Sequence, residues 1–364
     1  MRTVRHLIYR EVLSAVGFTT LAFLALMFFF DFVDQLGRIG RPGYTLTSAL
    51  LSTTLELPGR FYELFPITVL IGSIYALSRL AQSSEFTILR TAGLGPGRAL
   101  GMLSSLGLAF AVLTLLAGDV LAPAAEQKNV SLKALASGSL SVGPAGAWMR
   151  DRIDEASGDH RTVSVHVSRL GGGGELQGVR IYEFDERHRL LSISQAASGR
   201  YVDDNRWQLT DVLLTRLGTA SASVEHHEQL GWQSVLTPDI LSVLFVLPER
   251  MSAWNLFQYS RHLGDNNQNA ERYDIAFWKK LLYPFATLVM MGLALPFAYI
   301  HSRAGGVGAK VFSGIMLGVL FHLLNSLFSH IGLLNHWSPL LSALGPSLLF
   351  VSAAVLMMVW VERR

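Results

Sequence analysis

The hydrophobic pattern of the chain consists of long apolar runs on either side of a more polar centre. A helix that crosses a lipid bilayer needs about 20 mostly apolar residues. Six stretches approach this length, and they occupy residues 12–33, 61–80, 99–121, 277–300, 311–331 and 339–361. The first run is too long for the core of a cleaved signal peptide. The pattern therefore predicts six transmembrane helices in two groups of three.

The polar centre, residues 122–272, carries frequent charges and no run long enough to span a membrane. Apolar and polar side chains alternate in three short pieces, and clusters of Gly, Asp and Asn separate them; the pieces are residues 162–167, 178–183 and 191–194. This alternation is typical of short antiparallel strands. We expect an all-β sandwich or roll, followed by a helix with Ser252 as its N-cap. The predicted parts are thus residues 1–121, 122–272 and 273–364.

Composition and charge agree with a membrane protein. Only 16% of the 364 residues are charged, against about 25% in soluble domains. Basic residues gather at the ends of the apolar runs, and their bias across short loops sets membrane orientation. The bias predicts cytoplasmic termini and an external central domain, which in a Gram-negative cell means the periplasm; Lys279 and Lys280 run against it. The absence of cysteine excludes disulfide bonds and thiol chemistry.

Motifs of catalytic or nucleotide sites are missing from the sequence. Neither GxxxxGK[ST] nor HExxH occurs, and the Gly-rich stretch at residues 305–308 lacks the preceding strand that a phosphate loop requires. His322 and His330 lie near one face of the fifth predicted helix, where hydrogen-bonded packing is commoner than metal binding. We predict no metal site, no cofactor bound by this chain and no catalytic residue. A membrane enzyme with an unrecognised site is the alternative.

The short loop between the second and third predicted spans contains a candidate helix at residues 83–93. Ser83 is a suitable N-cap, and Glu85 falls in the first turn, where the helix dipole favours an anion. Phe86 and Leu89 share one face, and Arg90 follows them. A short amphipathic helix of this kind docks into a partner's groove or lies on a surface. We favour docking.

The outer end of the first predicted helix carries charges at membrane depth, where ionisable residues are costly and are candidates for function. Asp31 and Asp34 share a face, and Arg38 follows Asp34 at a spacing that permits an ion pair. One interpretation is therefore a salt bridge at a helix end. The other is a charged mouth for an anionic head group, with Arg38 and Arg41 as phosphate donors.

A GxxxG pattern, formed by Gly314 and Gly318, occurs in the fifth predicted helix. Small residues at this spacing allow two helix backbones to approach closely. The pattern predicts helix-seam packing, either within the chain or against a helix of another chain.

Taken in order, these pieces resemble the LptF/LptG (YjgP/YjgQ-type) permeases of lipopolysaccharide export. The resemblance covers nearly the whole chain and includes the order of three helices, β-domain and three helices. Two of its motifs, at residues 32–36 and 255–263, look more like the LptG branch than the LptF branch. The motifs that carry it lie at residues 32–36, 57–66, 84–85, 90–93, 255–263 and 277–281.

The resemblance implies a transporter subunit with no nucleotide site of its own. Such permeases form an LptF/LptG pair on two LptB-type ATPase subunits, which bind ATP and Mg. The complex takes lipopolysaccharide from the outer leaflet of the inner membrane and passes it to a periplasmic β-jellyroll bridge that begins with an LptC-type protein. The resemblance further implies a jellyroll-like central domain and ATPase coupling through the helix that holds Glu85, Phe86, Leu89 and Arg90.

The chain departs from the family where many members carry a basic residue facing the glycolipid phosphates. Asp31 occupies that position here. We expect the substrate to contact Arg38 and Arg41 instead, with Asp34 nearby and acyl chains against Phe29, Phe30 and Phe32. The alternatives are the paralogous LptF role, and a non-transporting scaffold for a periplasmic assembly.

Overall fold

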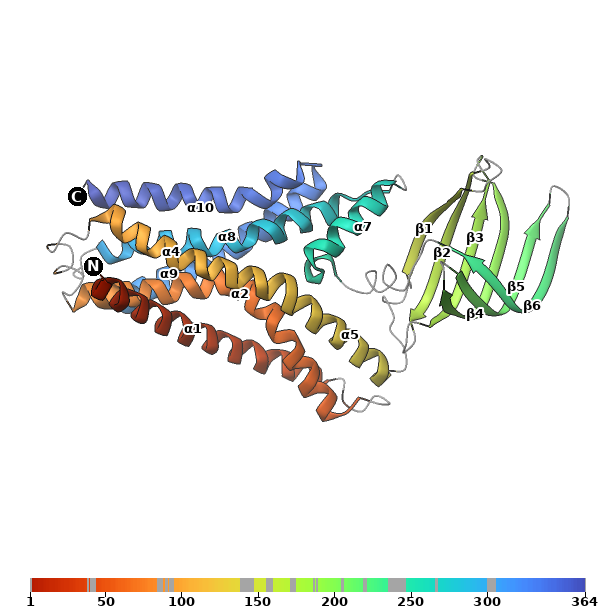
Figure 1. Ribbon diagram of the computed structural model, residues 1–364, viewed down its shortest axis with the longest axis horizontal. Helices are drawn as coiled ribbons and strands as arrows, with labels where there is room; N and C mark the ends of the chain where they lie inside the picture. Colours follow the sequence, from red (N-terminus) through yellow and green to blue (C-terminus); the bar gives the residue numbers. More distant parts are fainter. Residues whose placement is uncertain are drawn as a thin grey trace.

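The computed structural model describes a long helical bundle with a β-sheet beyond one of its ends (Figure 1). Both chain termini lie at the opposite end of the bundle. The described residues are 2–37, 39, 44–83, 88, 91, 95–137, 147–154, 160–170, 175–185, 187, 189–203, 206–218, 221–234, 247–265, 268–299 and 306–363.

Six helices of the described chain are long and apolar enough to cross a membrane, which confirms the predicted number and grouping. Four of the six begin four or more residues before the predicted apolar run, because the residues ahead of the run continue the helix. The structure assigns the six helices as α1 (Arg2–Leu36), α2 (Leu46–Gln82), α4 (Pro96–Leu116), α8 (Glu271–Tyr299), α9 (Val307–Leu334) and α10 (Pro339–Glu362).

The third span continues without interruption far past its apolar run. A π-helical turn, η1 (Ala117–Leu121), joins α4 to α5 (Ala122–Ser137). Gly118 lies against the ring of Tyr62, and a Cβ atom there would lie 2.2 Å from a ring carbon. The rise of hydrophilicity after Leu121 therefore marks a change of environment along one helix and not the end of the helix.

The core of the bundle is built on α2 and α8, which are the most deeply buried spans. Leu70, Ile74, Met290 and Met291 are fully buried in it. Helices α1, α9 and α10 pack around this centre and keep wide apolar faces exposed. Such faces suit lipid or partner helices better than water.

The predicted β-structure is confirmed within residues 147–233, where the described strands form one antiparallel sheet, whereas residues 122–137, which the prediction placed in this domain, belong to α5. The strands of the sheet follow one another in sequence order, as a meander. They are β1 (Ala147–Asp154), β2 (His160–Leu170), β3 (Leu176–Phe184), β4 (Leu190–Asp203), β5 (Arg206–Leu217) and β6 (Ala222–Gln233). Within the described residues these strands belong to one continuous sheet.

Alternating side chains give this sheet one buried face. Val163, Val165 and Val167 of β2 pack with Trp207 of β5, which is fully buried. Gly178 interrupts the alternation of β3 with a φ of +63°, a backbone conformation that glycine adopts at little cost. Because of this irregularity, residues on both sides of Gly178 contribute to the same buried cluster.

The chain returns from the sheet to the membrane helices through a short 3-10 turn, η2 (Pro248–Arg250), and α7 (Ala253–Asp265). Ser252 caps α7 as expected: its Oγ accepts a hydrogen bond from the N–H of Asn255 at 3.1 Å. Helix α7 packs on α8 to form a hairpin.

Candidate functional site

Charged side chains collect at the end of the bundle that faces the sheet. We call this set the polar cluster; it comprises Asp31, Glu56, Arg60, Glu63, Asp119, Glu126, Lys133, Arg250 and Lys280. Twenty residues separate Arg10 from Asp31 along the helix, and twenty separate Arg98 from Asp119, which is about 30 Å in each case. This equals the thickness of a bilayer's hydrocarbon core. The polar cluster therefore begins where one face of the membrane meets water.

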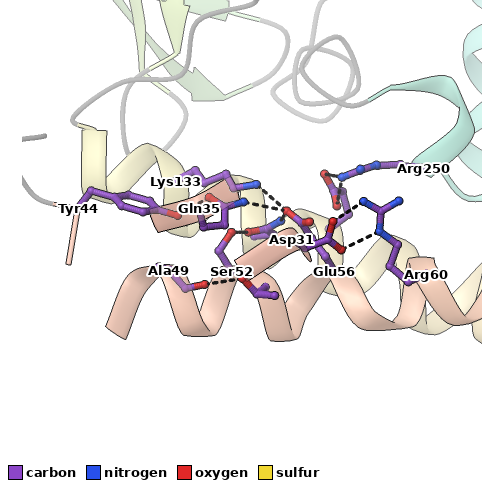
Figure 2. Close-up of polar contacts among 12 residues, drawn as sticks. Asp31, Gln35, Tyr44, Ala49, Ser52, Glu56, Arg60, Lys133 and Arg250 are labelled. Carbon is purple, nitrogen blue, oxygen red and sulfur yellow. Dashed lines mark hydrogen bonds and ion pairs between the residues drawn. The ribbon is translucent and has the colours of Figure 1, made fainter. Parts of the chain in front are cut away.

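Asp31 and Arg60 form a two-pronged ion pair between α1 and α2 (Figure 2). The guanidinium donates from Nε to Oδ2 at 2.9 Å and from Nη2 to Oδ1 at 2.7 Å. The side chains of Arg60 and Asp31 are 30% and 15% exposed. The partner of Asp31 thus comes from the neighbouring helix. Arg38 and Arg41, which the sequence predicts as donors to substrate phosphate groups, lie outside the described residues.

Glu56 is the acceptor that joins three helices. Its carboxylate, in a side chain only 10% exposed, accepts hydrogen bonds from Lys133 Nζ at 3.0 Å and Asn129 Nδ2 at 3.3 Å. Gln35 Nε2 also donates to it at 3.5 Å. Asn129 in turn accepts a hydrogen bond from Ser52 at 2.7 Å. These contacts fasten α1, α2 and α5 to one another outside the apolar core (Figure 2).

The segment that returns from the sheet is fixed at three points. Arg250 donates to both carboxylate oxygens of Glu126 at 3.0 Å. The carboxylate of Asp119, in η1, accepts the backbone N–H of Ala253 at 2.6 Å and so caps the start of α7. The buried ammonium of Lys280 donates to the carbonyl of Met251. Residues 250–253 are therefore held by η1, α5 and α8 together.

A pocket lies among these groups, between α2, α5, η2 and α8. Three cations line it, Arg60, Arg250 and Lys280, together with four glutamates; the other lining residues are Leu55, Gly59, Tyr62 and Ala122. The lining glutamates outnumber the cations: Arg250 pairs with Glu126, Arg60 lies 3.5 Å from Glu63, and Lys280 donates to the carbonyl of Met251. The pocket is a structural network more than a cation-rich anion site. Within the described parts of the chain, no group of three or more metal-ligating side chains occurs.

The aromatic side chains predicted to hold acyl chains occupy two environments on α1. Phe29 and Phe30 are more than half exposed on the outside of the bundle. Phe32 is half-buried and stacks with Phe28 at a ring separation of 6.1 Å. Asp34 is exposed. Phe29 and Phe30 can therefore meet lipid or a partner helix, and neither lines the pocket described above.

The GxxxG glycines face α2 of the same chain. A Cβ at Gly314 would lie 2.7 Å from Ile74, and one at Gly318 would lie 2.5 Å from Ile67. Both glycines are buried. The seam that they form is therefore packing within the chain, the first of the two alternatives.

The predicted coupling residues Glu85, Phe86, Leu89 and Arg90 lie outside the described residues. Ile88 and Thr91, between and beside them, have helical backbone, and Thr91 Oγ1 donates to the Ile88 carbonyl at 2.9 Å. Ser83 is the C-cap of α2, and the residues that follow it directly lie outside the described part of the chain.

Residues 6–360 match the family described as "Lipopolysaccharide export system permease LptF/LptG". The chain belongs to the LptF/LptG family. It is 29% identical to the lipopolysaccharide export system permease protein LptG of Haemophilus influenzae, over 99% of this chain and 98% of that protein. It is also 29% identical to LptG of Escherichia coli K12, over 94% of this chain and 93% of that protein.

Membership of the LptF/LptG family confirms the resemblance and makes the chain a permease subunit of lipopolysaccharide export. A permease family favours a transporter subunit over the alternative of a membrane enzyme. With its six apolar helices it is a multi-pass inner-membrane protein. Sequence reasoning missed Glu56, Arg60 and Lys133 of the polar cluster. Glu56 and Arg60 had one signal in the sequence, because residues 56, 60 and 63 are charged and spaced to share a helix face beside an apolar run; Lys133 had none.

Proposed function

We propose that the chain is the LptG-type subunit of a lipopolysaccharide exporter, which extracts the glycolipid from the outer leaflet and delivers it to a periplasmic β-bridge. The names of the two relatives support the LptG type over the LptF type. One structural observation carries the transport proposal: the polar cluster and the sheet lie at the same end of the bundle. A lipid that leaves the membrane at the polar cluster meets the sheet next.

In the proposed orientation the sheet is periplasmic and both termini are cytoplasmic. The termini lie together at the bundle end opposite the sheet (Figure 1). That end also carries Arg5, Arg10, Arg79 and Arg98, as the preference for basic residues on the cytoplasmic side requires.

The proposed partners are an LptF-type permease, two LptB-type ATPase subunits and an LptC-type bridge protein. The exposed apolar faces of α1 and α9, with Phe18 and Phe312 strongly exposed, suit contacts with other membrane helices. ATP and Mg belong to the ATPase in this proposal, and this chain binds no cofactor. Closure of the ATPase moves the segment around Glu85, and that movement is passed to α2 and α4, between which the segment lies.

The proposed substrate contacts are Arg38 and Arg41 for phosphate groups and Phe29, Phe30 and Phe32 for acyl chains. The pairing of Asp31 with Arg60 supports this assignment. Asp31 presents no bare negative charge to a phosphate, because a guanidinium already covers both of its oxygens. The aspartate at this position is therefore compatible with an anionic substrate.

The test of the coupling proposal is the charge reversal Glu85→Arg in the full chain. We expect the co-purifying ATPase to be lost and export to fail. The matched control is Glu228→Arg, a reversal on the exposed surface of β6, which should change neither. Retained ATPase with normal export in Glu85→Arg would contradict the coupling assignment. Purification of the wild-type chain without any ATPase would instead favour the scaffold.

A further inference from the structure

Four aromatic side chains form a continuous strip across the hairpin of α7 and α8. We call Trp254, Phe257, Phe277 and Trp278 the aromatic strip. Successive ring centroids are 6.1 Å apart for Trp254 and Phe257, 6.0 Å for Phe257 and Phe277, and 5.6 Å for Phe277 and Trp278. Trp254 and Phe257 are exposed, while Leu256 on the opposite face of α7 is fully buried.

The aromatic strip is continuous with the outward-facing surface of the membrane-spanning part of α8. Phe277, Leu281 and Phe285 follow one another at four-residue spacing, so they share one face of the helix. Leu281 and Phe285 are both exposed. An apolar surface therefore runs from the span of α8 onto α7 without a polar break.

Both helices of the hairpin become polar in the same direction, away from the bundle. The exposed side of α7 continues from Phe257 to Arg261 and Asp265, both exposed. The first turn of α8, which packs beside that end, carries Glu271 and Arg272. A patch for a folded partner is commonly apolar with a polar rim all round. Here the exposed side chains of α7 change from aromatic at Trp254 and Phe257 to charged at Arg261 and Asp265, and Gln258 is an exposed polar neighbour at the level of the strip itself.

The height of the aromatic strip agrees with this gradient. Lys280 belongs to the polar cluster, and its ammonium contacts the carbonyl of Met251. Phe277 lies three residues from Lys280 on α8, about 5 Å along the helix, and Trp254 lies at the start of α7, three residues after Met251, so both rings lie near that contact. Tryptophan and other aromatic residues are enriched at this level of membrane proteins, where apolar and aqueous surroundings meet.

We propose that α7 and the first turns of α8 form an interfacial anchor, whose aromatic strip inserts among the phospholipid head groups and upper acyl chains beside the bundle. The anchor fixes the height of residues 250–253, and hence of the connection to the sheet, relative to the membrane surface. This inference is independent of what the protein exports. It concerns a lipid surface and does not rest on the proposed coupling or substrate residues.

This chain contains no cysteine, so one introduced cysteine gives a single spin-label site within it, provided that cysteines of the co-purifying subunits are replaced by serine. The full chain, with the subunits that co-purify, is reconstituted in phospholipid nanodiscs, and accessibility to oxygen and to a water-soluble nickel chelate is measured by electron paramagnetic resonance. Phe257→Cys is the test site, and Trp254→Cys is the second site should the first fail to fold. Arg261→Cys, one turn above Phe257, completes the depth series.

Two control sites calibrate the depth scale. Leu356→Cys lies in the span of α10 at 69% exposure, and Val224→Cys lies on the sheet at 66% exposure. We expect the depth of the Phe257 label to fall between the two controls, and the Arg261 label to resemble Val224. Access of nickel to Phe257 equal to that at Val224 would overturn the anchor. Exclusion of both reagents from Phe257 would also overturn it and would indicate a covering protein.

Discussion

The pair of Asp31 and Arg60 gives the sharpest quantitative prediction. The perturbation is a double-mutant cycle of Asp31→Ala, Arg60→Ala and the double variant. Charge-assisted hydrogen bonds contribute about 1.5–3 kcal/mol, whereas exposed ion pairs contribute about 0–1 kcal/mol. This pair has two short bonds and side chains that are 15% and 30% exposed. We expect a coupling energy of about 1–2 kcal/mol, between these limits.

The two single variants should differ in cost. Arg60→Ala leaves the more buried Asp31 carboxylate without its guanidinium, so it should destabilise by about 2–3 kcal/mol. Asp31→Ala leaves behind Arg60, which is more exposed than Asp31 and still lies 3.5 Å from Glu63. This variant should therefore cost about 1–1.5 kcal/mol. The exchanged variant, Asp31→Arg with Arg60→Asp, places the same charges on the same two helices and should recover part of the loss.

The assay is the free energy of unfolding of the purified full chain in mixed micelles, measured by titration with a denaturing detergent. The matched control is the exposed pair of Arg216 and Glu225 on the sheet, whose closest atoms are 3.8 Å apart. We expect its coupling energy to be under about 0.5 kcal/mol. Effects of Asp31→Ala and Arg60→Ala that add to within about 0.5 kcal/mol would refute the reasoning.

Three further predictions concern packing and the connection to the sheet. Gly72→Ala places a Cβ 2.6 Å from the backbone of α1 and should destabilise by about 1–3 kcal/mol in the same assay, whereas Gly17→Ala, with open space around its Cβ, should be nearly neutral. Arg250→Ala leaves Glu126 without its cation and should speed proteolysis around residues 247–253. A proteolysis rate equal to that of the wild-type chain would contradict the conclusion that this pair holds residues 250–253 in place. Trp207→Ala removes the fully buried indole of the sheet, at a cost of about 3–5 kcal/mol, and should raise amide exchange in β2–β6 but not in α8.

The number and order of the spanning helices could be predicted because a helix needs about 20 mostly apolar residues to cross the membrane, and runs of that length are visible in the sequence. Period-two alternation likewise revealed β2, β3 and β4, and the hydroxyl of Ser252 identified the start of α7. The limits of the third span could not be predicted. The polar residues after Leu121 are good helix formers, so the helix continues to Ser137 although its apolar run has ended.

The polar cluster was only partly foreseen. The charge of Asp31 was visible in the sequence, and its cost at membrane depth made a partner necessary. The i+4 spacing suggested a partner only for Asp34, namely Arg38, and no local spacing pointed to Arg60 of α2 as the partner of Asp31. Glu56 and Lys133 are 77 residues apart, and nothing in their local sequence connects them.

The sequence by itself determined the membrane class, the insertion of a β-domain between two groups of three helices, and the family. Those properties follow from local patterns of apolarity, charge and motif order, which do not require knowledge of which helix packs on which. Only the tertiary structure decided that Arg60 covers Asp31, that Gly314 and Gly318 pack on α2, and that residues 250–253 are held by three elements. Each of these depends on side chains brought together from distant positions, and that proximity is set by the packing of the whole bundle.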